Sequence, residues 1–241
     1  MDIHGRGVLI TGASRGLGAA LARVLARQGA RLALVARGEQ ALDEVAAAIR
    51  AAGGEAHAIA ADVGAKDEVY PIAGAAASLV GEVEVLVHNA SELGPVPLAL
   101  LADTACEELE RVLAVNVVGP FRLTKALAGP MLLRQRGLVV HVSSDAATAA
   151  YPRWGAYGAS KAALDHLARI WPAELDGSGV RFFGVDPGEM DTAMHAAAVP
   201  DADRRSLARP EEIACKLAQM IGDDTIPNGA RLEAAAWTAA R

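Results

Sequence analysis

Hydrophobic positions along the chain follow two periods in turn. Short apolar runs at 7–11, 31–36, 55–60 and 83–88 are separated by alanine-rich segments in which apolar residues recur at helical spacing. Those segments predict helices at 19–28, 39–50 and 66–79. A strand that is followed by a helix and then by another strand is a βαβ unit, and repeated units of this kind build a parallel sheet.

The second half of the chain continues the alternation. It predicts a helical stretch at 103–134, a strand at 137–144, a helix at 157–175, a strand at 179–185 and a final helix that begins near Pro210. Several strands, such as "RLALVA" and "VEVLVH", are almost continuously apolar, which is typical of a sheet covered by helices on both faces. The pattern predicts an α/β fold: one Rossmann-like, doubly wound parallel sheet.

We expect a single domain over residues 1–241, because the sequence contains no Pro-, Gly- or Ser-rich linker and no internal repeat. The segment 188–208 has weak periodicity, and we expect it to form a mobile insertion over the edge of the sheet, beside the substrate.

Composition narrows the functional class. Hydrophobic residues make up 52% of the chain but aromatic residues only 4%, which suits tightly packed helices. The net charge of −6 argues against binding to nucleic acid or to an anionic membrane, since there is no excess of Lys and Arg to neutralise phosphates. No signal peptide or membrane-spanning run is evident, and the two cysteines lack metal-ligand spacing, so we expect a cytoplasmic protein without a metal site.

Glycines follow the first predicted strand in "VLITGASRGLG" and open the next helix. In this context glycines allow a tight turn, a close approach of the backbone to a pyrophosphate, and close packing of the helix, whose first amides then face the phosphates. An ordinary strand-to-helix turn is the alternative interpretation. We predict a dinucleotide site here that includes Gly12, Ser14, Arg15, Gly16, Leu17 and Gly18.

The residue at the end of the second predicted strand helps to determine which dinucleotide binds. An acidic residue there binds the ribose 2′-hydroxyl of NAD(H), but this chain has Ala36 followed by Arg37. Arg37 and Arg15 could neutralise a 2′-phosphate, because guanidinium groups offer paired donors to phosphate. Unless both arginines are merely solvated, the sequence favours NADP(H) over NAD(H).

A tyrosine and a lysine lie four positions apart in "AYGASKAAL", on one face of a predicted helix. A nearby ammonium favours phenolate, so Lys161 is expected to lower the pKa of Tyr157, which could then act as a general acid and base. A packed tyrosine beside a solvated lysine would be the ordinary alternative. The preceding strand ends in Ser143 and Ser144, at the edge where doubly wound sheets bind ligands, and a serine hydroxyl there can donate to a developing oxyanion.

Taken together, these motifs resemble the short-chain dehydrogenase/reductase family over essentially the full length. The matching segments are "TGASRGLG", Asp62–Val63, "HNAS" at 88–91, Asn116 in "LAVNVVG", Ser144, "YGASK" and "DPGEMDT" at 186–192. The resemblance implies hydride transfer between a nicotinamide and a ketone or secondary alcohol. It also implies a homodimer or homotetramer formed through the helices at 103–134 and 157–175.

The resemblance also implies roles for individual residues. Tyr157 would exchange the proton, Lys161 would bind the nicotinamide ribose, Ser144 would hold the substrate carbonyl, and Asn116 would bend its helix and hold a water that links Lys161 to solvent. The remaining cofactor contacts would come from Asp62, Val63, Asn89, Ala90, Pro187, Gly188, Met190 and Thr192.

Some features leave alternatives open. Ser91 stands where the family usually has glycine, Pro172 lies inside a predicted helix where a kink is expected, and the chain ends in "WTAAR" rather than in a glycine-rich segment. His88 and His141 are interpreted as satisfied histidines in the sheet. A reductase of carrier-bound 3-oxoacyl groups, with Arg153, Arg204 and Arg205 as its basic surface, and a non-catalytic NADP(H)-binding redox sensor are the competing functions.

Overall fold

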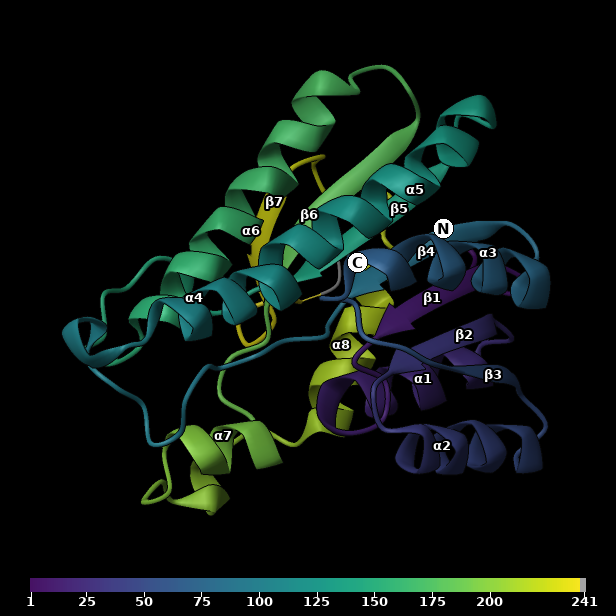
Figure 1. Ribbon diagram of the computed structural model, residues 1–241. Helices are drawn as coiled ribbons and strands as arrows, with labels where there is room; N and C mark the ends of the chain where they lie inside the picture. Colours follow the sequence, from purple (N-terminus) through teal and green to yellow (C-terminus); the bar gives the residue numbers. More distant parts are fainter. Residues whose placement is uncertain (239–241) are drawn as a thin grey trace.

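A computed structural model describes residues 1–238 and contains one parallel sheet with strand order β3-β2-β1-β4-β5-β6-β7 (Figure 1). The order reverses between β1 and β4, which makes the sheet doubly wound. The predicted α/β class is therefore confirmed. The strands are β1 (Gly7–Thr11), β2 (Arg31–Ala36), β3 (Glu55–Ala60), β4 (Val83–His88), β5 (Gly137–Val142), β6 (Val180–Asp186) and β7 (Ala230–Glu233).

Helices cover both faces of the sheet, and they are α1 (Gly16–Arg27), α2 (Glu39–Ala51), α3 (Val69–Val80), α4 (Cys106–Leu113), α5 (Gly119–Leu133), α6 (Gly155–Glu174), α7 (Ala193–Ala198) and α8 (Pro210–Gly222). One buried cluster joins α1, α2 and α8 to the sheet, and the other joins α3 and α5 to its opposite face. Along β1, Val8 and Ile10 belong to the first cluster and Leu9 to the second. Side chains of a strand alternate between faces, so an almost continuously apolar strand supplies both cores.

The seventh strand was not predicted. Its sequence, "ARLE", is short and carries two charged residues, so it lacks the apolar run by which the other strands were found. It pairs in parallel with β6 at the edge of the sheet, with Arg231 beside Gly184. Tertiary pairing, rather than local propensity, makes this segment a strand.

The helical stretch predicted at 103–134 is divided in three. After α4 the chain forms a π turn at Ala114–Val118, and α5 begins at Gly119. Helices can kink at such a turn, and the bend that the resemblance implies at Asn116 stays a prediction. Helix α6 runs through Pro172 and ends two residues later, at Glu174, so the proline lies in its last turn.

The segment 188–208 contains regular structure despite its weak periodicity. Thr192 caps α7, since its hydroxyl accepts a hydrogen bond from the amide of His195 at 3.2 Å, and Met190 and Ala208 form an isolated bridge. In Figure 1, α7 lies at the lower left of the molecule, apart from the helices that cover the sheet. The predicted mobility of this segment stays a prediction.

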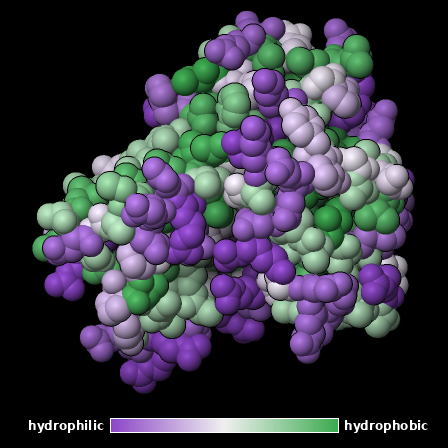
Figure 2. All heavy atoms as spheres, viewed as in Figure 1, coloured by the Kyte–Doolittle hydropathy of each residue, from purple (hydrophilic) through white to green (hydrophobic). Residues whose placement is uncertain are grey.

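Some large apolar side chains are exposed at the surface, among them Tyr70, Leu101 and Leu133. Hydrophilic residues are interspersed with hydrophobic ones over the face that Figure 2 shows. Within residues 1–238, no helix is both long enough and apolar enough to cross a membrane.

Candidate active site

A cleft of about 910 Å³ opens at the carboxyl ends of the strands, where the strand order reverses between β1 and β4. Ligands of doubly wound sheets bind at this position. The cleft extends from the turn after β1, past the ends of β2 and β4, to helix α6. Its lining includes the predicted residues Gly12, Ser14, Arg15, Gly16, Leu17, Arg37, Asp62, Val63, Asn89, Ala90, Tyr157, Lys161, Pro187, Met190 and Thr192.

The turn after β1 depends on its glycines. Gly12 has a φ of +68°, and a Cβ there would lie 2.7 Å from the Cα of Ala90. A Cβ on Gly18 would overlap the carbonyl oxygen of Gly12. Gly18 therefore does not line the cleft but lets helix α1 pack beneath the turn.

Asn89 holds this turn against β4. Its side-chain amide donates to the carbonyls of Thr11 and Gly12, at 2.9 and 3.0 Å. The amide of Ala90 donates to the hydroxyl of Thr11 at 3.1 Å. Asn89 and Ala90 thus shape one wall of the cleft in addition to lining it.

Cationic groups gather at the end of the cleft near the turn after β1. Helix α1 begins at Gly16, and among the described residues no side chain caps its first turn, so its amides suit an anion. Arg15 and Arg37 line the same end, and Arg37 forms an exposed ion pair with Glu92 at 3.4 Å. Amides, a helix N-terminus and two guanidinium groups are the donors that the phosphates of a dinucleotide require.

Asp62 and Val63 lie farther along the cleft, after β3. The Asp62 carboxylate accepts a hydrogen bond from the amide of Gly64 at 2.8 Å, which fixes this loop. Both residues line the cleft, and their predicted contact with adenine stays a prediction.

The opposite end of the cleft holds Tyr157 and Lys161, one turn apart on α6 and both buried. The ammonium lies 5.5 Å from the centre of the tyrosine ring and donates to the carbonyl of Val142 at 2.8 Å. Trp154 packs edge-on against the ring of Tyr157. The phenol and the ammonium therefore face the same end of the cleft from fixed positions.

Burial dominates the titration of both groups. It raises the pKa of Tyr157 to about 12; hydrogen bonds from the Ser144 and Ser91 hydroxyls oppose the rise, and Asp186 and Asp145 add to it. Burial also lowers the pKa of Lys161 to about 8 against the opposing charge of Asp165. The expectation that Lys161 lowers the pKa of Tyr157 is therefore wrong for this structure, because desolvation of the phenolate outweighs every favourable contact.

Asn116 lies in the π turn and is fully buried. Its side-chain amide donates to the hydroxyl of Ser160 at 2.8 Å and to the carbonyl of Glu92 at 2.9 Å, and its oxygen accepts from the amide of Glu92 at 2.8 Å. These contacts tie the loop after β4 to helix α6. Asn116 does not line the cleft, and its side chain serves as a brace between those elements.

The segment after β6 closes the nicotinamide end of the predicted site. Pro187, Met190 and Thr192 line the cleft, whereas Gly188 does not: its φ is +72° and its amide donates to the Asp186 carboxylate at 3.0 Å. Ser144 is not among the residues that line the cleft; its hydroxyl donates to the Asp145 carboxylate at 3.0 Å and lies near Tyr157, where it favours the phenolate.

The sequence did not reveal two features of the site. Ser91 places its hydroxyl between Tyr157 and the side-chain oxygen of Asn116, to which it donates at 3.3 Å. The sequence did offer a signal for this role, because Ser91 in "HNAS" adds a hydroxyl at a position where the family usually has glycine. The second feature is Arg231, on the strand that was not predicted, whose guanidinium contacts the carbonyl of Ser144.

The interpretation of the sheet histidines is half wrong. His88 shares a hydrogen bond with the hydroxyl of Thr124 at 2.8 Å, but neither ring nitrogen of His141 has a partner among the described residues. Their rings lie 5.0 Å apart on neighbouring strands, and burial lowers the pKa of His141 to about 3. Across residues 1–238, no group of His, Cys, Asp or Glu is arranged to hold a metal ion.

Comparison with known proteins places this site in a family. Residues 6–203 match the family described as short chain dehydrogenase. The 3beta-hydroxysteroid dehydrogenase 1 of Eggerthella lenta is 31% identical over 235 residues, which cover 92% of this chain and 88% of that protein.

Two solved structures superpose on this chain over nearly its whole length. A short chain dehydrogenase from Shigella flexneri, complexed with NADP, superposes with a TM-score of 0.90 at 29% identity, over 97% of this chain and 99% of that one. An NAD+-bound xylitol dehydrogenase superposes with a TM-score of 0.86 at 26% identity, over 97% and 98% of the two chains.

Proposed function

This chain belongs to the short-chain dehydrogenase/reductase family of oxidoreductases that act on alcohols and ketones, and we propose that it is an NADP(H)-dependent enzyme in which Tyr157 exchanges the proton. One observation carries the proposal. A buried tyrosine, whose phenolate form the nearby Ser144 hydroxyl favours, lies at one end of a cleft whose other end presents helix-terminal amides and two arginines.

The residues present fit a dinucleotide along the whole cleft. The uncapped first turn of α1 suits the pyrophosphate, and Asp62 and Val63 lie beside the adenine end. When bound, the nicotinamide supplies or accepts the hydride.

The protein side of the reaction is proton transfer and orientation. Tyr157 gives its hydroxyl proton to the carbonyl oxygen during reduction and takes it back from the alcohol during oxidation. The Ser144 hydroxyl donates a hydrogen bond to the same substrate oxygen, which stabilises the charge that develops there. Lys161, held by the Val142 carbonyl, would bind the nicotinamide ribose.

NADP(H) is preferred on electrostatic grounds. Ala36 and Arg37 stand at the end of β2, so these two positions offer no carboxylate to accept the ribose 2′-hydroxyl of NAD(H), and a 2′-phosphate would compete with the exposed Glu92 ion pair for Arg37. The two solved relatives carry NADP in one case and NAD+ in the other, so the preference rests on the side chains of this chain.

A small molecule fits the mouth of the site better than an acidic carrier protein. Of the basic residues considered for carrier binding, Arg204 is held by both carboxylate oxygens of Asp191, at 2.8 and 3.0 Å, and Arg205 pairs with Asp203. Asp145 and Glu189 add negative charge near Tyr151 at the same mouth. This charge distribution disfavours an anionic partner.

The decisive variant is Tyr157→Phe, which removes the exchangeable proton and keeps the ring. Turnover should fall by about 10²- to 10⁴-fold, the usual contribution of a general acid or base. The dissociation constant of NADPH should change less than about threefold, because the ring still lines the cleft. Tyr70→Phe, on the exposed face of α3, is the matched control and should leave both quantities unchanged.

A redox sensor would give a different result. NADPH would bind tightly to the wild-type protein, no carbonyl compound would consume it, and Tyr157→Phe would change nothing that can be measured.

A further inference from the structure

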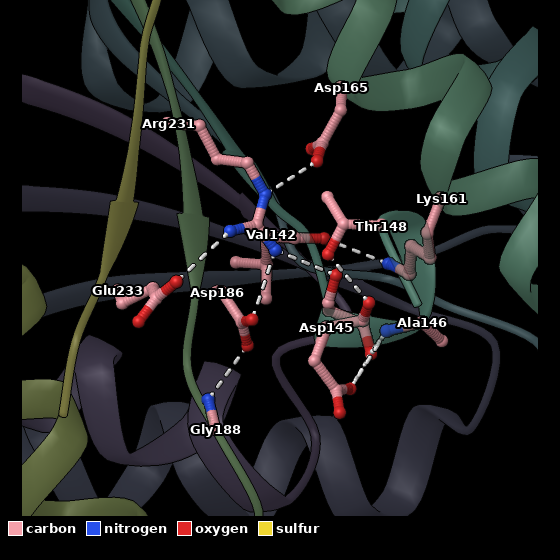
Figure 3. A network of polar contacts seen from close by, with 11 residues as sticks. Val142, Asp145, Ala146, Thr148, Lys161, Asp165, Asp186, Gly188, Arg231 and Glu233 are labelled. Atoms are coloured by element: carbon pink, nitrogen blue, oxygen red, sulfur yellow. Dashed lines mark hydrogen bonds and ion pairs between the residues drawn. The ribbon is translucent and has the colours of Figure 1, made fainter. Parts of the chain in front are cut away.

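A buried ion cluster connects the unpredicted strand to the catalytic end of the cleft (Figure 3). We call it the Arg231 cluster: Arg231 on β7, Asp165 on α6, Asp186 at the end of β6, and the backbone carbonyl of Ser144. Nε of Arg231 contacts Asp165 Oδ2 at 2.9 Å. Its Nη2 contacts Asp186 Oδ2 at 3.0 Å and the Ser144 carbonyl oxygen at 2.9 Å.

The arrangement of acceptors in the Arg231 cluster suits a guanidinium group. The side chains of Asp165 and Asp186 are only 7% and 9% exposed, and buried carboxylates require partners. Arg231 contacts one oxygen of each carboxylate with fixed, diverging donors and also donates to the Ser144 carbonyl, while the other oxygen of Asp165 has no partner among the described residues. A lysine would supply a charge from a single point and could not hold all three acceptors in the same plane.

Each acceptor belongs to an element that carries part of the proposed active site. Asp165 lies one turn beyond Lys161 on α6. The other oxygen of Asp186 accepts the amide of Gly188, where the segment that lines the nicotinamide end begins. Ser144 lies just after the end of β5, and its backbone is extended, with a φ of −163° and a ψ of 157°.

The contact with Ser144 is the one with chemical consequence. Its carbonyl accepts a hydrogen bond from Arg231, while its hydroxyl donates to the Asp145 carboxylate at 3.0 Å, accepts from the amide of Ala146 at 3.2 Å and lies beside Tyr157, whose phenolate form it favours. Fixing the carbonyl fixes the rotation of this peptide, and with it the direction from which the hydroxyl approaches the tyrosine. Small displacements of a group that orients a substrate lower the rate of the chemical step far more than they weaken binding.

We propose that Arg231 is a positioning residue for the reaction: it acts through the Ser144 backbone to hold the serine hydroxyl against Tyr157. This inference rests on the proposed function, because it assigns Ser144 a part in turnover.

The test compares Arg231→Met and Arg231→Lys with wild type as full-length proteins, with NADPH and whichever of diacetyl, cyclohexanone and acetoacetyl-N-acetylcysteamine the wild type reduces fastest. We expect Arg231→Met to lower kcat by about ten- to a hundredfold while KM and the NADPH dissociation constant change less than about threefold. Arg231→Lys should recover part of the lost kcat, because it keeps the charge but not the fork.

Arg181 provides a matched control. It is a partly buried arginine on β6, 21% exposed against 23% for Arg231, and it binds Asp224 and the carbonyls of Asp223 and Ile226 far from Ser144. Arg181→Met should lower Tm about as much as Arg231→Met does and leave kcat within about twofold of wild type.

A double-mutant cycle separates positioning from stability. In a Ser144→Ala background, Arg231→Met should lower kcat by less than about twofold, because the group it positions is gone. An equal loss of kcat in both backgrounds, or a wild-type kcat in Arg231→Met, would overturn the inference. Should Arg231→Met not fold, the same cycle with Arg231→Lys decides the question. A wild-type protein that reduces none of the three probes would instead refute the proposed function, and this inference with it.

Discussion

Tyr157 and Lys161 are buried side by side, and both are energetically costly in their charged forms. Burial raises the pKa of the phenol to about 12 and lowers that of the ammonium to about 8. Two serine hydroxyls favour the phenolate, and Asp165 favours the ammonium. The site therefore keeps titratable groups away from water at a cost in stability, which is common where a protein uses them chemically.

The cost at Lys161 depends on pH. The folded protein releases this proton near pH 8 and the unfolded chain near 10.5, so the free energy of unfolding should rise with pH between these values. The gain across the whole window is on the order of 3 kcal/mol, from the size of the shift. Lys161→Met should lack this rise, whereas Lys125→Met, on the exposed face of α5, should keep it.

Denaturant unfolding at several pH values between 8 and 10 measures the difference. Parallel pH dependence of wild type and Lys161→Met would contradict the lowered pKa.

Ser91 affects the acid–base behaviour of Tyr157. Its hydroxyl is one of two that lower the tyrosine pKa, so Ser91→Ala should raise that pKa further. The rise of alcohol oxidation with pH would then move to higher pH, because oxidation needs the phenolate. Ser91→Thr keeps a hydroxyl and should stay near the wild-type profile; coincident profiles for all three proteins would exclude a role for this group.

Arg37 is predicted to bind the 2′-phosphate of NADP(H). Arg37→Asp should weaken NADPH by about tenfold or more and favour NADH, since a carboxylate repels the phosphate and accepts the ribose hydroxyl. Arg27→Ala, in the last turn of α1, should leave the ratio of the two dissociation constants unchanged. An unchanged ratio in Arg37→Asp would remove the electrostatic basis for NADP(H).

The turn after β1 shows what the sequence could reveal. Its glycines, the following helix and the cleft were all predicted from "VLITGASRGLG", because the constraint is local and requires residues without a Cβ. The role of Asn89 as a brace across two strands was not, since its partners Thr11 and Gly12 lie far away in sequence.

Elements defined by distant contacts were among those missed. Strand β7 exists because "ARLE" pairs with β6, and its arginine is held by carboxylates from two other elements. The π turn at Asn116 likewise reflects side-chain contacts with Glu92 and Ser160 rather than a local helix-breaking residue. Periodicity reports local structure, so it could place the helices but not these tertiary features.

A methyl group at Gly18 tests the packing of α1 beneath the turn. Gly18→Ala would push against the carbonyl of Gly12, so it should lower Tm and weaken NADPH binding by about tenfold or more. Gly74→Ala, within α3 where nothing lies within 4 Å of an added Cβ, should instead stabilise the protein by about 0.5–1 kcal/mol. Similar behaviour of the two variants would contradict the account of the turn.

The molecule has a sheet with two apolar faces, each covered by helices, and a cleft lies where the strand order reverses. Phe121 on α5 and Ile170 on α6 remain 40% and 36% exposed on the outer surface. They lie on the helices through which the sequence predicts a homodimer or homotetramer. Light scattering should give a dimer or tetramer mass, which Phe121→Glu and Ile170→Glu together reduce and Tyr70→Glu, on α3, does not; a monomeric wild type would refute this assembly.

Consumption of NADPH by the purified wild-type protein, followed by nicotinamide absorbance with a panel of ketones, diketones and acyl thioesters and repeated with NADH, tests the proposed enzyme as a unit. We predict that one class of carbonyl compound is reduced with NADPH, more slowly with NADH, and not by Tyr157→Phe. Tight binding of NADPH with no consumption by any member of the panel would contradict the assignment and favour a protein that senses the cofactor without turning it over.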